Sequence, residues 1–95
     1  MALAGVTVYS YTMTKAEKLL AKARARPGGL SFSEFETLLA RAGWTFQRQR
    51  GSHRLWMSPG RFRLPIQNAD GTAKRYQVEQ FLDRFDKEQE QHAEA

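Results

Sequence analysis

The chain has 95 residues with 15 Lys or Arg against 10 Asp or Glu, a formal net charge of +5, 41% apolar residues and no cysteine. This length fits one small soluble domain with a compact core and leaves no room for a second domain. The absence of cysteine excludes a disulfide scaffold, a thiol nucleophile and every thiolate metal site. No apolar run predicts a membrane span or a secretory signal, so we expect a cytoplasmic protein.

Positive charge is concentrated in the middle of the chain. Residues 41–75 contain eight Lys or Arg and one Asp, whereas residues 76–95 contain two basic and six acidic residues. A basic block of this density is typical of proteins that bind polyanions, because each phosphate contact releases counterions. The alternative is a solvated charged surface.

The first predicted element is a short helix. Residues 1–13 show no clear period, and we interpret them as a flexible N-terminal tail. Thr14 and Glu17 then match a capping box, and apolar residues recur at helical spacing until the Pro-Gly-Gly sequence at 27–29 ends the pattern.

A second helix is predicted over residues 33–42. Ser31 and Ser33 each open one of two overlapping capping boxes, apolar residues follow at helical spacing, and Gly43 ends the pattern.

The next segment changes to a period of two, which is typical of strands. Alternating runs at 44–49, 53–58 and 61–66 predict three strands in an antiparallel meander. Gly51 supplies the first turn, and Pro59-Gly60 predicts a type II turn with a positive φ at Gly60.

A turn at 68–71 follows the third strand and leaves open a short fourth strand at 72–75. The last predicted helix begins near Tyr76 and fades into an acidic C-terminal tail at 87–95. The predicted class is therefore α+β, in the order α-α-β-β-β-α, with a three-stranded antiparallel sheet and helices on one face.

Strand parity assigns side chains to the two faces of this sheet. We expect the helix-facing side to carry Phe46, Leu55, Met57, Phe62 and Leu64. We expect the open, basic side to carry Thr45, Gln47, Gln49, Arg54, Trp56, Arg61 and Arg63. A single bulge reverses such parity, and Trp56 fits a tryptophan shielded by arginine stems as well as it fits a binding residue.

The tripeptide Gly51-Ser52-His53 lies at the first predicted turn. Three arginines flank it: Arg48, Arg50 and Arg54. In RNA cleavage a histidine could take the proton of a 2′-hydroxyl or protonate the leaving 5′-oxygen, while arginines stabilise the transition-state charge, and no metal is needed. A lone histidine is more often an ordinary surface residue, and the sequence leaves open whether His53 acts as acid or base.

Two runs of the chain resemble a known family. The HicA family of toxin endoribonucleases, from bacterial toxin–antitoxin pairs, is closely matched by Phe35-x-x-Leu38-Leu39-x-x-Ala42-Gly43-Trp44-x-Phe46-x-Arg48-Gln49-x-Gly51-Ser52-His53. Longer members of the family are matched by Gln67-Asn68-x-x-Gly71-x-Ala73-Lys74-x-Tyr76-Gln77-Val78-x-Gln80-Phe81-Leu82. The resemblance covers residues 14–86, which we assign to a HicA-like domain.

The resemblance implies a double-stranded-RNA-binding-like α-β-β-β-α fold, here with an extra N-terminal helix, that cleaves messenger RNA without a metal or another cofactor. It also implies neutralisation by a HicB-type antitoxin protein and assigns the catalytic histidine to His53. Gly51 would be the turn residue, and Ser52 is a motif residue without an assigned role. Because the segment after the third strand departs from the short family members, antitoxin contacts and substrate choice are not carried over.

Candidate RNA contacts come from the basic block itself. They are Arg48, Arg50, Arg54, Trp56, Arg61, Arg63, Lys74 and Arg75, the last two beside a helix N-terminus that favours phosphate. Two other functions fit the same residues: a catalytically silent RNA- or DNA-binding domain that uses the same face, and an interaction protein that docks a partner on Trp56.

Overall fold

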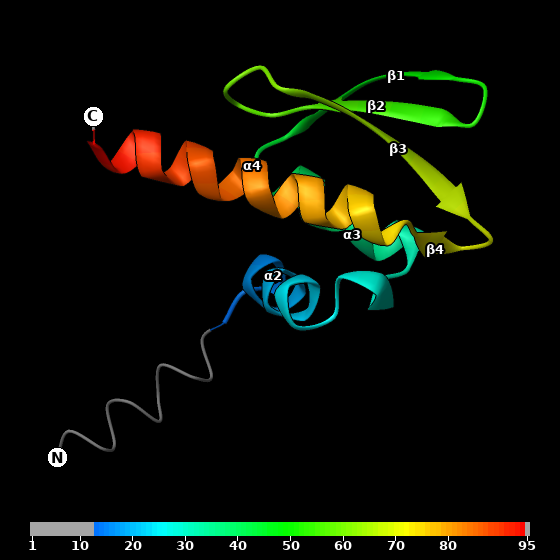
Figure 1. The fold of residues 1–95 in the computed structure, drawn as a ribbon, viewed down its shortest axis with the longest axis horizontal. Coiled ribbons are helices and arrows are strands. Elements are labelled where there is room, and N and C mark those ends of the chain that lie inside the picture. Colours follow the sequence, from blue (N-terminus) through cyan, green and yellow to red (C-terminus); the bar gives the residue numbers. More distant parts are fainter. Residues whose placement is uncertain (1–12, 95) are drawn as a thin grey trace, which may run out of the picture.

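The computed structural model describes residues 13–94, with side chains over 13–91, so the tail predicted at 1–13 lies outside the described residues except for Met13. The elements in chain order are α2 (Lys15–Ala25), the 3-10 turn η1 (Pro27–Gly29), α3 (Phe32–Arg41), β1 (Thr45–Arg50), β2 (His53–Met57), β3 (Arg63–Ala69), β4 (Thr72–Ala73) and α4 (Arg75–Glu94). The chain thus has the predicted α+β class (Figure 1).

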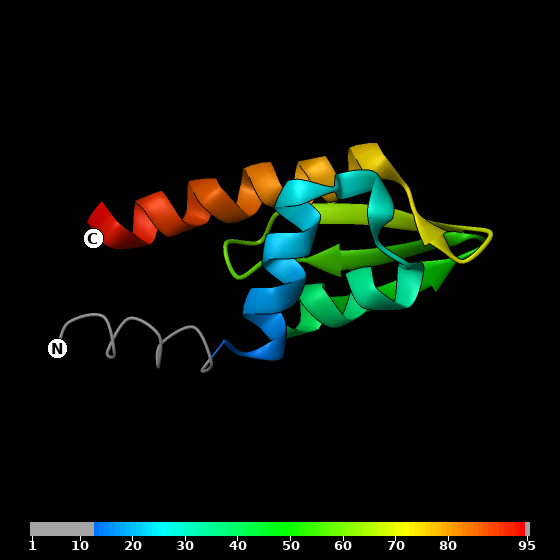
Figure 2. The same cartoon turned by 90° about the horizontal axis from the view of Figure 1, so that it is seen from below.

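The helices form one layer against one face of the sheet. Figures 1 and 2 show α2, α3 and α4 on the same side of β1, β2 and β3, and the other face of these strands is uncovered. Aromatic rings meet in the core: Phe81 of α4 packs edge-on against Phe35 of α3, with ring centroids 6.0 Å apart, and in a tilted arrangement against Trp44, at 5.2 Å.

The predicted caps fix the starts of the first two helices. Thr14 and Glu17 form the capping box of α2, as predicted. Of the two overlapping boxes before α3, the one used is Ser31 with Glu34, so this helix begins at Phe32. Each box satisfies backbone N–H groups that a helix start leaves without partners.

The sheet has four antiparallel strands in the order β1-β2-β3-β4, so the predicted count of three is wrong by one. The extra strand, β4, is only two residues long, and its hairpin turns through Asp70 and Gly71, which both have positive φ. A backbone hydrogen bond from Ala73 to Leu30 ties β4 to the segment before α3. Tertiary contact therefore stabilises a strand too short to show a period.

The turn between β2 and β3 differs from the predicted type II turn. The residue with positive φ is Arg61, at 73°, and not Gly60. Glycine has another purpose at position 60, because a Cβ there would lie 2.7 Å from a carboxylate oxygen of Glu88. Close approach of α4, not backbone conformation, accounts for this glycine.

Glu88 fastens α4 to this turn. Its carboxylate accepts hydrogen bonds from the Ser58 hydroxyl, from the Gly60 N–H at 3.0 Å and from Arg84 at 2.9 Å. The helix continues to Glu94, through the segment assigned to an acidic tail. No helix in the described part of the chain is long and apolar enough to cross a membrane.

Replacing Glu88 with Ala should lower the free energy of unfolding by about 1–3 kcal/mol, because the buried Ser58 and the turn lose their half-buried acceptor. Chemical denaturation measures this change. Asp83→Ala is the matched control, since Asp83 is exposed and pairs with Lys87 at the surface, and the loss of this ion pair should cost no more than about 0.5 kcal/mol. Equal losses in the two variants would contradict the role of Glu88.

The same contribution should depend on pH. Burial raises the pKa of Glu88, but hydrogen bonds from Ser58, Arg84 and the Gly60 N–H outweigh it and leave the pKa below its ordinary value. A lowered pKa in the folded state stabilises the protein above the ordinary value and ceases to do so as the pH falls through the lowered value. The difference in the free energy of unfolding between wild type and Glu88→Ala should accordingly become smaller in acid. A difference that does not change with pH would contradict the lowered pKa of Glu88.

Candidate functional site

Trp56 points toward the helices, so the prediction that it lies on the open face is wrong. Its side chain is 6% exposed, and its indole N–H donates to a carboxylate oxygen of Glu36 in α3 at 3.0 Å. It stands opposite Phe46 on one side and Leu64 on the other. The strand and its period were predicted correctly, but its phase was inverted.

Arg54 shares the helix-facing side with Trp56, which also corrects the prediction. Its guanidinium donates to the same oxygen of Glu36 and to Gln49 at 2.9 Å, and it lies 4.2 Å from the ring centroid of Phe46. Gln49 pairs with Arg54 and so also belongs to this side. The positive charge of the half-buried Arg54 is therefore paired with a carboxylate of the fold itself.

A bulge in β1 separates Phe46 from the arginines that follow it. The pairing with β2 shifts between Phe46 and Arg48, which leaves Gln47 without a partner. Arg48 therefore stands opposite Leu55 and Arg50 opposite His53, on the open face. Without the bulge, strict alternation would turn Arg48 toward the helices with Phe46.

The open face carries a basic groove, which we define by the residues lining two adjoining hollows. One hollow, of about 150 Å³, is lined by Arg48, Arg50, His53, Leu55 and Pro65. The other, of about 190 Å³, is lined by Gln47, Arg48, Leu55 and Arg63. The two share Arg48 and Leu55, and none of these lining residues is acidic.

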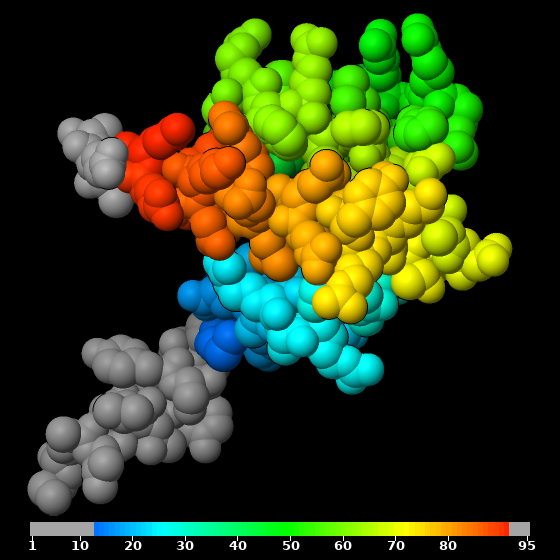
Figure 3. Space-filling view, viewed as in Figure 1, coloured from blue at the N-terminus to red at the C-terminus, as the bar shows by residue number. Residues whose placement is uncertain are grey.

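Side chains of the groove stand away from the helical layer. Figure 3 shows side chains from the green segments projecting from the side of the sheet opposite to the helices. Leu55 and Met57, predicted to face the helices, are half-buried on this open side. Their position follows from the inverted phase of β2: because Trp56 points toward the helices, its two neighbours in the sequence point toward the open face.

His53 lies at the end of the groove, exposed, directly after the turn between β1 and β2. The turn is a two-residue loop, Gly51-Ser52, in which only Gly51 has a positive φ, at 60°. This pattern is typical of a type II′ hairpin turn, for which glycine is preferred at the first position. The predicted turn at Gly51 is confirmed.

Gln67 is a site residue that the sequence analysis did not single out. It stands opposite His53 in β3, and its amide Nε2 donates to the Ser52 hydroxyl at 3.3 Å. Its Oε1 accepts from Lys74 Nζ at 2.8 Å, which brings Lys74 to the side of the His53 turn. The sequence contains one signal for it: Gln67 follows Pro65 by two residues, so the two side chains lie on the same face of the strand.

Two further candidates lie away from His53. Arg61 occupies the β2–β3 turn, at the opposite end of the β2 strand. Arg75 pairs with Glu79 at 3.1 Å and lines a separate hollow beside η1 together with Arg26. The structure therefore brings Arg48, Arg50 and Lys74 near His53 and places Arg63 farther along the basic groove, opposite Met57, whereas Arg61 and Arg75 line neither hollow of the groove.

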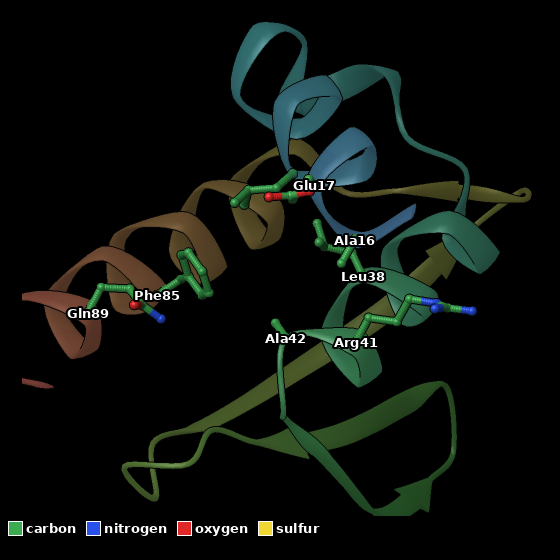
Figure 4. A pocket seen from close by; sticks show the side chains of 8 residues that line it. Ala16, Glu17, Leu38, Arg41, Ala42, Phe85 and Gln89 are labelled. Carbon is green, nitrogen blue, oxygen red and sulfur yellow. The ribbon is translucent and has the colours of Figure 1, made fainter. Parts of the chain in front are cut away.

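A second type of hollow lies on the helical side. It has a volume of about 270 Å³ and an apolar lining that includes Leu20, Leu38 and Phe85 (Figure 4). It is bounded by α2, α3 and α4, and it shares no lining residue with the basic groove.

The structure defines a small basic α+β domain with an open sheet face suited to a polyanion and an exposed histidine at its end. The family model of the HicA toxin of bacterial toxin–antitoxin systems matches residues 32–86, which include the whole basic groove. The chain belongs to this HicA toxin family, which confirms the resemblance found in the sequence and implies a cognate antitoxin as partner. No curated protein and no solved structure matches the chain.

Replacing Trp56 with Ala should lower the free energy of unfolding by about 3–5 kcal/mol, because the change empties a core position and removes one of the two donors to Glu36. Arg48→Ala, on the other strand face, should change it by no more than about 0.5 kcal/mol. Denaturant unfolding of both variants tests the assignment of faces. A stable Trp56→Ala variant would contradict it.

Proposed function

We propose that this chain is a type II toxin that acts as an endoribonuclease on messenger RNA in the cytoplasm, that it needs no metal, and that a HicB-type antitoxin inhibits it. The observation that carries the proposal is the exposed His53 at the end of a groove lined by Arg48, Arg50 and Arg63 and by no carboxylate. Membership of the HicA toxin family supports the same reading.

The proposed reaction is an internal transfer at phosphorus. The 2′-oxygen of a nucleotide forms a bond to the adjacent phosphorus, and the bond from phosphorus to the 5′-oxygen of the next nucleotide breaks. The 2′-hydroxyl loses a proton and the leaving 5′-oxygen gains one, and His53 carries out one or both transfers. Arg48 and Arg50 stabilise the additional negative charge on the phosphoryl oxygens at the transition state.

The groove has the chemistry that a ribonucleotide chain requires. Leu55 and Pro65 form an apolar floor, against which sugars and bases pack, and the arginines at its edges meet phosphates. The order α3-β1-β2-β3-α4 is that of a double-stranded-RNA-binding-like domain, to which α2 and β4 are additions. We infer from this order and from the groove that the domain is related to double-stranded-RNA-binding folds and that its substrate is RNA.

His53→Gln should abolish RNA cleavage and growth arrest while leaving the fold intact, because the exposed imidazole contributes nothing to the core. Induction of each protein in cells, followed by growth and bulk messenger RNA, measures the effect. His92→Gln, the change of the other histidine in the chain, is the matched control and should behave like wild type.

Purified protein with RNA and a chelator tests the absence of a metal requirement. Cleavage that stops on chelation would overturn that part of the proposal. Full toxicity of His53→Gln would overturn the role of His53, and tight RNA binding without any cleavage by wild type would identify a nucleic-acid-binding domain in place of an enzyme.

RNA affinity should depend on the groove arginines. In a His53→Gln background, which keeps the RNA uncut, Arg48→Ala and Arg63→Ala should each reduce the slope of log affinity against log salt by about 0.7–0.9, the value for one phosphate contact. Arg41→Ala is the control, because Arg41 is exposed at the end of α3 on the helical side. Equal slopes in all three variants would contradict RNA binding in the groove.

A further inference from the structure

The side chain of Gln67 links three segments that meet at the His53 turn. Its amide contacts Lys74, which precedes α4, and Ser52, which precedes β2. Its backbone N–H donates to Oε1 of Gln77 at 2.9 Å, and Gln77 is only 3% exposed. The start of α4 therefore fixes both the backbone and the side chain of Gln67.

Lys74 determines which way the amide of Gln67 points. A lysine ammonium group is a donor only, so the atom 2.8 Å from Lys74 Nζ has to be the amide oxygen. The amide nitrogen then faces Ser52, where it donates to the hydroxyl oxygen. The reverse orientation would place two donors against each other at Lys74.

Ser52 is one of the two residues of the loop that leads into His53. The other, Gly51, has open space around it, since a Cβ there would meet no atom within 4 Å. Two side chains hold the loop: Gln49 donates to the Gly51 carbonyl at 3.1 Å, and Gln67 donates to Ser52. Of these, only the bond from Gln67 connects the loop to another strand, because Gln49 belongs to β1, which the loop itself continues.

We propose that Gln67 is a positioning residue, which holds the Ser52 hydroxyl and thereby fixes the direction in which the loop presents the His53 imidazole. Lys74 sets the orientation of the Gln67 amide, and Ser52 is the group through which Gln67 acts. This inference rests on the proposed function, because a correctly placed imidazole matters for proton transfer at phosphorus.

Loss of the Gln67 amide should therefore slow the reaction more than it weakens binding. We expect Gln67→Met to lower kcat about tenfold, the effect of one lost hydrogen bond, and to leave KM within about twofold. Ser52→Ala should have a similar effect, and the double variant should be no slower than either single variant, because both changes break the same bond.

The experiment compares cleavage of a short RNA by wild type, Gln67→Met, Ser52→Ala and the double variant. Gln80→Met is the matched control, since Gln80 is exposed on α4 and should leave kcat unchanged. NMR relaxation of the Ser52 amide, without RNA, gives a readout that does not need activity. We expect the order parameter to fall from about 0.85 toward 0.6 in Gln67→Met and to be unchanged in Gln80→Met.

The outcomes distinguish a failure of this inference from a failure of the proposed function on which it rests. Unchanged kcat and Ser52 order in Gln67→Met, with cleavage by wild type that depends on His53, would overturn the inference alone. A raised KM with normal kcat would make Gln67 an RNA contact and also overturn it, as would additive losses in the double variant. An inactive wild type would overturn both.

Discussion

The contact between Trp56 and Glu36 determines which face β2 turns toward the helices. An indole that is 6% exposed, with its N–H donated to a carboxylate of α3, allows β2 only one of its two possible faces against the helices. Once Trp56 is inside, Arg54 is inside as well, and His53, Leu55 and Met57 are outside. The basic groove thus follows from the burial of Trp56 in β2 together with the bulge in β1.

The carboxylate of Glu36 also determines which arginines of the sheet have an acidic partner and which do not. Glu36 accepts from Arg54 as well as from Trp56, so the arginine that shares the buried side has a partner within the fold. The charges left on the open side, from Arg48, Arg50 and Arg63, face no acidic residue among those lining the groove. Pairing of the half-buried Arg54 with its counter-charge Glu36, and exposure of the other arginines, gives the sheet two chemically different faces.

Local signals were sufficient for most of the fold and insufficient for the faces of the sheet. Thr14 and Ser31 mark helix starts by hydrogen bonds within four residues, and Gly51 marks a turn by its own backbone, so both kinds of feature are legible in sequence. The phase of β2 depends on a contact with Glu36, 20 residues away, and the bulge at Gln47 has no sequence signature. Gln67 was overlooked because its partners, Ser52 and Lys74, come from separate segments.

Mutations on the open face of the sheet and mutations on its buried face have different effects on the protein. Side chains of the open face, such as His53 and Arg50, contribute nothing to the core, so alleles altered there encode intact, folded chains. Under the proposed function, selection for cells that survive the toxin would favour such alleles alongside truncations. Under the same proposal, such an allele still supplies a folded chain that can bind the antitoxin, which leaves fewer antitoxin molecules for active copies of the toxin in the same cell.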